Sequence, residues 1–367
     1  MKIFGHTLWP NNRQKRQNTT KPMKYQQPST IIGAVAVAVA TMIVSTSNTA
    51  KAASLFYEGF DYTANQTLLG NNGGTGFSTA WQTNGTSLGN AWVNSGSFGY
   101  TDSFGNVLAT SGNRGMITGD GTATGSNTGG NTGNGQAIRQ LALAGLPGGV
   151  GLGSNGVATT WISFVAQRTD AAFIASNGSN YLHGRAGSLQ LFSGNNAAGG
   201  AGSENLSVGR ASQNGETTIG DLTDDTWAIF NAGNANGQKA STLSFLNPTF
   251  ILMRIDHVGT VATTLGNADT AYIWYNLPDI SLEPSIGTAN TTITSSEFAS
   301  TRDYSVSALR LFGGSRNATV GYGQLEIDEL RGGTAYGDVT PIVGVPEPAA
   351  ATVLGLGALA MIWRRRK

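Results

Sequence analysis

Short stretches of alternating hydrophobic and polar residues recur between residues 55 and 341, and this period of two is that of a β-strand. The clearest stretch is TTWISFVAQ, residues 159–167. Successive side chains of a strand point to opposite faces, so this stretch has two distinct faces. One face carries Ile162, Phe164 and Ala166, and the other carries Trp161, Ser163 and Val165.

Four further stretches are predicted to be strands: 249–258, in which Ile251, Met253 and Ile255 share a face, 270–277, 308–314 and 323–333. Between the stretches lie pairs such as Asn84-Gly85, which supply the positive φ angles of tight turns. There is no regular repeat that would indicate a solenoid or propeller. The pattern therefore predicts an all-β fold, with a single large β-sandwich over residues 53–341.

One Gly/Asn-rich stretch, residues 119–136, interrupts this pattern. Low-complexity sequence of this kind is typical of a flexible loop, and we place it inside the sandwich domain. A boundary between two domains is the alternative interpretation, although the composition does not change across the stretch.

The composition narrows the function classes. The chain has 367 residues, of which 12% are charged and 39% hydrophobic, and its net charge is +1. The densest basic cluster lies at the C-terminus, and the region between the two ends has no basic stripe to neutralise nucleic-acid phosphates. The chain has no cysteine, which excludes disulfides, thiolate metal sites and cysteine nucleophiles.

The N-terminus has the pattern of a secretory signal peptide over residues 1–52. Two lysines, Lys21 and Lys24, precede the apolar run IIGAVAVAVATMIV, and Ala50 and Ala52 form a small-x-small cleavage site. Met23 would give a signal of ordinary length and is a second candidate for the true start. A buried core helix or an uncleaved anchor is the alternative.

The C-terminal segment, residues 345–367, has three unlike parts in order. Prolines 346 and 348 break continuity with the preceding fold, and an apolar run of 15 residues follows. As a helix this run would be about 22 Å long, which is short of a hydrocarbon core of about 30 Å. The basic residues that end the chain are predicted to stay on the cytoplasmic side of a membrane.

This order closely resembles the PEP-CTERM sorting signal, through Val345, Pro346, Glu347 and Pro348, the apolar run, and the basic residues Arg364, Arg365 and Arg366. The resemblance implies an exported protein of a Gram-negative bacterium, anchored in transit in the inner membrane. It implies signal peptidase and an exosortase-type membrane protease as partners. The destination would be the cell surface or the extracellular polysaccharide matrix.

The region between the two ends resembles concanavalin A-like jelly-roll domains, through residues 55–82, 250–278 and 325–341. Laminarinase-like glycoside hydrolases share that fold and carry three acids on one face of a strand. Glu326 and Asp328 match the first two of these acids, whereas the third position is occupied by Leu330, or by Arg331 in the longer form of the motif. Alternation places Glu329 on the opposite face, so one half of a catalytic carboxyl pair is missing.

Other candidate sites are weaker. Asp61, Asp269 and Asp279 can supply oxygen ligands for a structural calcium, or can cap turns instead. His183 and His257 are the histidines of the mature region. Asp256 adjoins His257, but neighbouring residues of a strand point to opposite faces, so the two do not form part of a Ser-His-Asp triad. We therefore expect no catalytic metal, cofactor or triad.

Five tryptophans are candidates for stacking on sugar rings. The five are Trp81, Trp92, Trp161, Trp227 and Trp274, and most of them are expected in the core, as for Trp161 and Trp274 in the most apolar strands. Trp81 and Trp92 lie in Gly/Asn-rich surroundings and are the better candidates for an exposed carbohydrate-binding surface.

The leading hypothesis is thus a non-catalytic β-sandwich, structural or carbohydrate-associating, exported to the cell surface or matrix. A secreted polysaccharide hydrolase using Glu326 and Asp328 is the alternative. A permanently anchored surface protein is a third reading of the same sequence.

Overall fold

The structure is a computed structural model. It describes residues 54–83, 90–119, 135–142, 144, 151–153, 159–168, 173–174, 180–181, 187–193, 204–210, 226–231, 238–258, 268–297, 304–314 and 323–343. The signal segment with Ala50 and Ala52, the sorting segment 345–367, His183 and all but the ends of the loop 119–136 lie outside these ranges. Among the described residues, no helix is both long and apolar enough to cross a bilayer.

The described chain is built almost entirely of strands. In chain order they are β1 (Phe56–Glu58), β2 (Asn90–Asn94), β3 (Arg114–Thr118), β4 (Gly135–Gln140), β5 (Thr159–Gln167), β6 (Phe173–Ile174), β7 (Asn180–Tyr181), β8 (Gly187–Phe192), β9 (Glu204–Arg210), β10 (Thr226–Asn231), β11 (Gln238–Ser244), β12 (Thr249–Asp256), β13 (Thr270–Tyr275), β14 (Thr291–Thr294), β15 (Ala308–Gly313) and β16 (Gln324–Gly333). A 3₁₀ turn, η5 (Ile286–Thr288), and a one-turn helix, α2 (Tyr336–Val339), complete the described elements.

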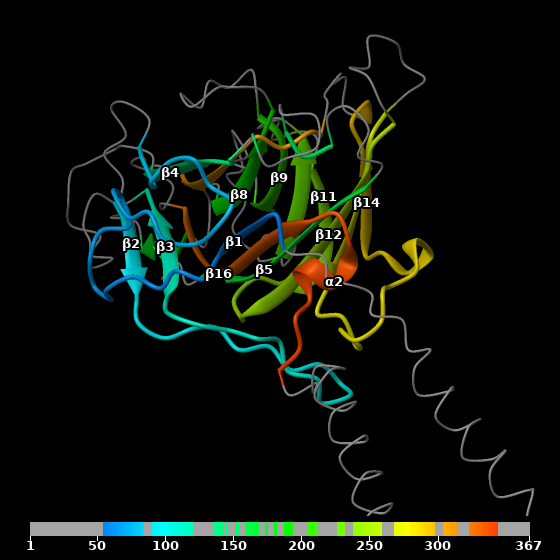
Figure 1. The fold of residues 1–367 in the computed structure, drawn as a ribbon, viewed down its shortest axis with the longest axis horizontal. Helices are drawn as coiled ribbons and strands as arrows, with labels where there is room; N and C mark the ends of the chain where they lie inside the picture. Colours follow the sequence, from blue (N-terminus) through cyan, green and yellow to red (C-terminus); the bar gives the residue numbers. More distant parts are fainter. Residues whose placement is uncertain are drawn as a thin grey trace, which may run out of the picture. The chain divides into compact units, whose positions relative to one another are not determined.

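The strands form two main antiparallel sheets, which makes the fold an all-β sandwich (Figure 1). The first sheet has the order β14-β13-β12-β5-β16-β3-β2, and β1 also pairs with β16. The second sheet has the order β11-β10-β9-β8-β15-β4, and β6 pairs with β7 in a separate ribbon. All the described strands fall within one compact unit, Thr49–Glu347.

The strands predicted from alternation are confirmed. β5 has the predicted bounds, and β12, β13, β15 and β16 each lie within their predicted stretches. The face of β5 with Ile162, Phe164 and Ala166 packs into the core between the sheets, together with Ile251, Met253 and Ile255 of β12. The second sheet contributes residues such as Leu189, Leu206 and Leu309 to the same core.

The outer face of the first sheet carries a second apolar cluster, because the opposite side chains of β5 and β12 are also covered. Trp161, Val165, Phe250 and Leu252 pack there against Phe98 and Leu108 and against Tyr336 and Val339 of α2. The chain between β2 and β3 and the chain after β16 therefore lie over this face, and Figure 1 shows α2 beside β5 and β16. These covering segments determine whether the acidic side chains of β16 are exposed or buried.

Candidate functional site

The acidic residues of β16 lie on the outer face of the first sheet. Their neighbours Leu325, Ile327 and Leu330 belong to the core between the sheets, so Glu326 and Asp328 point away from that core. This part of the sequence prediction is confirmed, because the two carboxylates share a face. Gly115 of β3 and Ala166 of β5 flank Ile327 in the ladder and fix this register.

A β-bulge then changes the pattern. Asp328 pairs with Val165 and Arg331 with Ser163, so three steps along β16 match two along β5. Glu329 is in the left-handed region, with φ of 55°. An extra residue in one strand shifts the alternation. The prediction that Glu329 points to the opposite face is therefore wrong: its carboxylate meets Tyr57 and Arg331, which pair with each other across the ladder.

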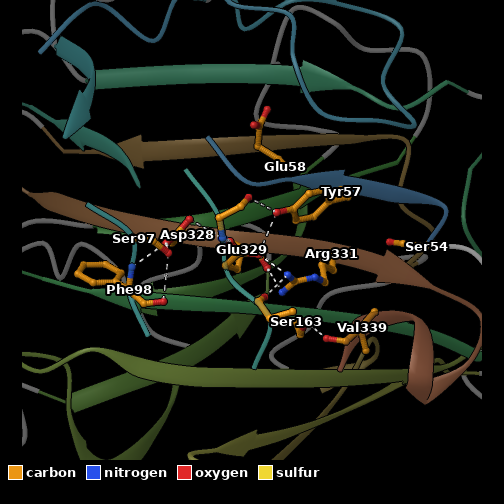
Figure 2. A network of polar contacts seen from close by, with 12 residues as sticks. Ser54, Tyr57, Glu58, Ser97, Phe98, Ser163, Asp328, Glu329, Arg331 and Val339 are labelled. Carbon is orange, nitrogen blue, oxygen red and sulfur yellow. Dashed lines mark hydrogen bonds and ion pairs between the residues drawn. The ribbon is translucent and has the colours of Figure 1, made fainter. Parts of the chain in front are cut away.

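The carboxylates of Glu326, Asp328 and Glu329 are all buried and hydrogen-bonded, and Figure 2 shows the contacts of Asp328 and Glu329. The Asp328 carboxylate accepts from the Ser97 hydroxyl at 2.5 Å, from the Phe98 amide at 2.7 Å and from the Glu329 amide at 2.8 Å. The Ser97–Phe98 segment is therefore attached directly to the strand.

Glu329 is held by a different set of donors. Its carboxylate accepts from the Ser111 amide at 2.5 Å and from the Tyr57 hydroxyl at 3.1 Å, and it forms an ion pair with Arg331 (Figure 2). The Arg331 guanidinium lies 4.9 Å from the centroid of the Tyr57 ring and also donates to the Ala109 carbonyl. Glu329 is fully buried by these groups.

Glu326 is paired as well. Its carboxylate meets the Arg114 Nε at 2.7 Å and accepts from the Asn94 side-chain amide at 2.9 Å. Only 5% of the residue is exposed. Arg114 and Asn94 come from β3 and β2, so the neighbouring hairpin supplies the counter-charge.

The electrostatics follow from this burial. Burial, together with the adjacent Glu329 charge, raises the pKa of Asp328 to about 8, although the Ser97 hydroxyl and the backbone donors oppose this rise. Burial also raises the pKa of Glu329, although Arg331 and the donors of Ser111 and Tyr57 oppose that rise. A raised carboxyl pKa is useful to a general acid, but the group must also reach a substrate. Here the three carboxylates accept hydrogen bonds or form ion pairs with residues of neighbouring loops and strands, and none of them faces solvent.

Trp81 is buried, which is contrary to its predicted exposure. Only 1% of it is exposed, its indole N–H donates to Glu58 at 3.0 Å, and its ring stacks on Phe60 with centroids 6.0 Å apart. The cause is a buried ion pair between Glu58 of β1 and Arg139 of β4, around which this segment folds. Trp92 is half-buried on β2, in register with Met116.

The three candidate calcium ligands are separate. Asp61 is exposed and accepts from Ser111, whereas Asp279 accepts from the amide and hydroxyl of Ser281 in a local turn. Asp269 accepts from the amides of Val258 and Tyr304. Within the described residues there is no group of three or more potential metal ligands. The turn-capping alternative describes Asp279, whereas Asp61 and Asp269 accept from residues at least 11 positions away and join separate segments.

His257 lies in a buried polar chain. Its Nε2 is 2.9 Å from the Thr160 hydroxyl, and its Nδ1 is 3.4 Å from the Asp269 carboxylate. Only 2% of the imidazole is exposed, and Gly153 packs directly on the ring. A substrate cannot reach the Thr160 hydroxyl in this arrangement, since Thr160 is fully buried. These hydrogen-bonded side chains instead hold the ends of β5, β12 and β13 next to one another.

A half-exposed strip at the other end of the outer face was not anticipated from the sequence. We call it the β13 strip; its members are Arg254, Asp256, Thr270, Tyr272 and Thr292, all partly exposed. Tyr272 pairs in the ladder with Arg254 on one side and Thr292 on the other.

The β13 strip continues an aromatic row. The Tyr272 ring is 6.4 Å from Trp274, which stacks on Trp161 at 6.1 Å. Arg254 lies over Trp161 and forms ion pairs with Asp256 at 2.7 Å and with Glu283 at 3.4 Å. The aromatic row can be predicted in part from the alternation of residues 270–277, because Tyr272 and Trp274 share a face. The sequence does not reveal that Trp274 is covered whereas Tyr272 is partly open.

No protein-family model matches the chain. No curated protein matches it either. Among solved structures, it is similar to an endo-β-1,4-glucuronan lyase from the fungus Trichoderma reesei, with 13% identity over 78% of this chain and 98% of that one, at a TM-score of 0.40. An endo-1,3-β-glucanase from Streptomyces sioyaensis has 11% identity over the same shares, at a TM-score of 0.40.

A third similar structure is the binding domain of botulinum neurotoxin serotype C1, with 11% identity over 71% of this chain and 48% of that one, at a TM-score of 0.31. No property of this chain follows from likenesses at these identities and TM-scores.

Proposed function

We propose that this chain is an exported surface or matrix protein whose β-sandwich, of jelly-roll type, binds extracellular polysaccharide without cleaving it. The observation that carries the proposal is a contrast on one sheet face. The acids of β16 are closed under the Ser97–Phe98 segment, whereas Tyr272 at the far side of the same face is partly open.

The β13 strip has the chemistry that suits a neutral sugar. A tyrosine offers a rigid apolar ring and a polar tip, so it stacks on the apolar face of a pyranose at small entropic cost. Thr270 and Thr292 flank it with hydroxyls that exchange hydrogen bonds with sugar hydroxyls. Asp256 and Glu283 neutralise Arg254, so the strip has no surplus positive charge to favour an acidic polymer.

Export and sorting belong to the same proposal and are supported by the two ends of the sequence. Signal peptidase would cleave after the N-terminal apolar run, at the small-x-small site. An exosortase-type membrane protease would recognise the terminal segment 345–367. Tags placed before Val345 and after Lys367 test this, because cleavage separates them. Both tags on one membrane species would contradict removal of the segment and support a permanent anchor.

Binding is tested by affinity electrophoresis of the sandwich, residues 53–344, through gels containing β-1,3-glucan, β-1,4-glucan or alginate. We expect retardation by a neutral glucan and at least about tenfold weaker retention of the Tyr272→Ala variant, which corresponds to about 1.4 kcal/mol. Phe104→Ala removes an aromatic ring that is 74% exposed elsewhere, and serves as the matched control. Equal retention of the Tyr272→Ala variant and the wild-type protein would contradict the role of the strip.

A second function, polysaccharide hydrolysis, is favoured by one observation. The bulge brings Glu329 onto the same face as Glu326 and Asp328, which supplies the third acid that the sequence pattern lacks. Retaining hydrolysis uses two carboxyls about 5–5.5 Å apart beside the sugar. For that, the Ser97–Phe98 segment would have to leave Asp328. Release of reducing ends that disappears in Glu326→Gln would establish this function instead.

A further inference from the structure

Three neighbouring segments carry exposed large apolar side chains, among them the following four. Phe104 is 74% exposed, Leu282 65%, Val343 57% and Val107 40%. We call these four residues the apolar rim. Single exposed apolar residues are ordinary, but several large ones on connected segments mark an interaction surface.

The three segments of the apolar rim are held together by specific bonds. The Val343 amide donates to the Val107 carbonyl at 2.8 Å, and Leu108 bridges to Ile342, so the last described residues run beside the hairpin at 101–107. Figure 1 shows this hairpin, in cyan, extending to the orange-red end of the described chain. Phe104 lies at the turn of the hairpin, where the Gly105 amide donates to Asp102.

Asp102 connects the hairpin to the segment that carries Leu282. Its carboxylate accepts from the Ile280 amide at 2.8 Å, and from the Phe104 and Asn106 amides at 2.9 Å each. The Asn106 side chain also donates to Asp279 at 3.2 Å. The apolar rim is therefore a fixed feature of the fold.

The segments that carry the apolar rim have no basic residue of their own to attract anionic headgroups. The segments 101–107, 278–288 and 341–343 contain no lysine or arginine, whereas Asp279 and Glu283 are present. A surface of this kind has no attraction for anionic headgroups, which are recognised by basic clusters. It suits apolar insertion at the boundary between headgroups and acyl chains.

The sequence after Val343 limits how far the apolar rim can lie from a bilayer. Six residues lead from Val343 to Ala349, where the apolar run of the terminal segment begins. Six fully extended residues span about 20 Å at most. If the terminal segment is inserted, Val343 is within that distance of the point where the chain enters the membrane, and the other members of the apolar rim lie on segments bonded to its own.

We propose that the apolar rim contacts the bilayer surface while the protein is anchored in transit, with Phe104 and Leu282 inserted among the lipid headgroups. The proposal depends on the membrane insertion of the terminal segment described under Proposed function. Its partner is a lipid surface with no requirement for anionic lipid. The contact would orient the sandwich on the membrane until the terminal segment is removed.

The absence of cysteine makes a direct test available. Phe104→Cys, Leu282→Cys and Val258→Cys are made in the full chain, labelled with an environment-sensitive fluorophore and reconstituted into phosphatidylcholine vesicles. Val258 is the matched control, because it is 49% exposed but lies away from the apolar rim. It follows the last residue of β12, whereas Asn276 and Leu277, which lead toward Leu282, lie beside the first residues of that strand. An Ala358→Cys variant reports separately on insertion of the terminal segment. Lipids carrying a quencher at a shallow or a deep acyl position are then compared.

We expect shallow quenchers to reduce the emission of the labels at 104 and 282 at least about twofold more than that of the label at 258, with no change when anionic phosphatidylglycerol is added. Deep quenching of the 358 label with no shallow quenching at 104 and 282 would overturn the proposal while leaving the sorting segment intact. No quenching at any position would overturn both. Thermal unfolding of each variant at the wild-type temperature verifies that the labelled proteins are folded.

Discussion

The Ser97 hydroxyl donates a hydrogen bond of 2.5 Å to the Asp328 carboxylate, across 231 positions of sequence. Together with the Phe98 amide, it attaches the chain between β2 and β3 to the strand that bears the acidic residues. Glu326 and Glu329 are bound to neighbouring segments in the same way, through Arg114 and the Ser111 amide. The acids of β16 thereby hold the cover of the outer sheet face in place.

Ser97→Ala tests this attachment. It removes one of three donors from a buried carboxylate, and we expect a loss of about 1–2 kcal/mol in the free energy of unfolding, measured by urea titration. Thr242→Ala, at an exposed position of β11, is the control and should change stability by less than about 0.5 kcal/mol. A Ser97→Ala protein as stable as the control would show that the hydroxyl does not contribute.

Asp328 should make stability depend on pH. Its folded pKa, about 8, lies above the ordinary value, so the folded state holds a proton that the unfolded state has released. The stability associated with this proton is complete below about pH 4 and is lost as the pH rises to about 8. The slope approaches about 1.4 kcal/mol per pH unit inside that window.

The Asp328→Asn variant, which cannot ionise, isolates this contribution. We expect it to be less stable than the wild-type protein at pH 5, because an amide nitrogen cannot accept from the donors around it, but to have a flatter dependence on pH between 5 and 8. Urea unfolding at several pH values measures both. Parallel curves for the two proteins would mean that Asp328 is not the titrating group.

The Glu58–Arg139 ion pair joins the two sheets, and both side chains are about 1% exposed. Arg139→Met leaves Glu58 buried without its counter-charge, so we expect a loss of about 3–5 kcal/mol. Arg254→Met, at a 24% exposed pair, should cost less than about 1 kcal/mol. Adding Glu58→Gln to Arg139→Met should recover part of the loss, and simple additivity of the two changes would argue against direct coupling.

Asp102 should control the order of 101–107 and 278–288, two of the three segments that carry the apolar rim. Burial alone would raise the pKa of its carboxyl, but the donors of Asn106, Ile280 and Phe104 hold the pKa below its usual value. Asp102→Asn replaces one accepting oxygen with a donor, and we expect at least about tenfold faster hydrogen exchange at the Ile280 amide. The amides of β5 provide the internal reference. Unchanged exchange at Ile280 would mean that other contacts fix the segment.

Alternation predicts the strands of the sandwich well where both faces are buried by regular packing. β5 and β12 are examples, since their two faces enter two different apolar clusters. Local pattern fails where one residue breaks the period. The bulge at Glu329 depends on a left-handed backbone angle that a Glu-Leu sequence does not indicate.

Burial of isolated aromatic residues is also set by distant contacts. Trp81 lies among glycines and asparagines, which predict exposure, but Glu58 and Arg139 build a buried site around it. Tyr272 and Trp274 share a face in sequence, and only the position of the covering segments leaves the first partly open. The closure of the acids has the same origin, because Ser97 and Ser111 lie more than 200 residues from β16.

The most direct test of the central claim is the release of reducing ends from β-1,3- and β-1,4-glucan by the wild-type sandwich and its Glu326→Gln variant, assayed beside binding to the same polymers. We predict that the wild-type protein binds a neutral glucan and that neither protein releases reducing ends above the buffer control. Turnover by the wild-type protein that is abolished in Glu326→Gln would contradict it and would make the β16 carboxylates catalytic.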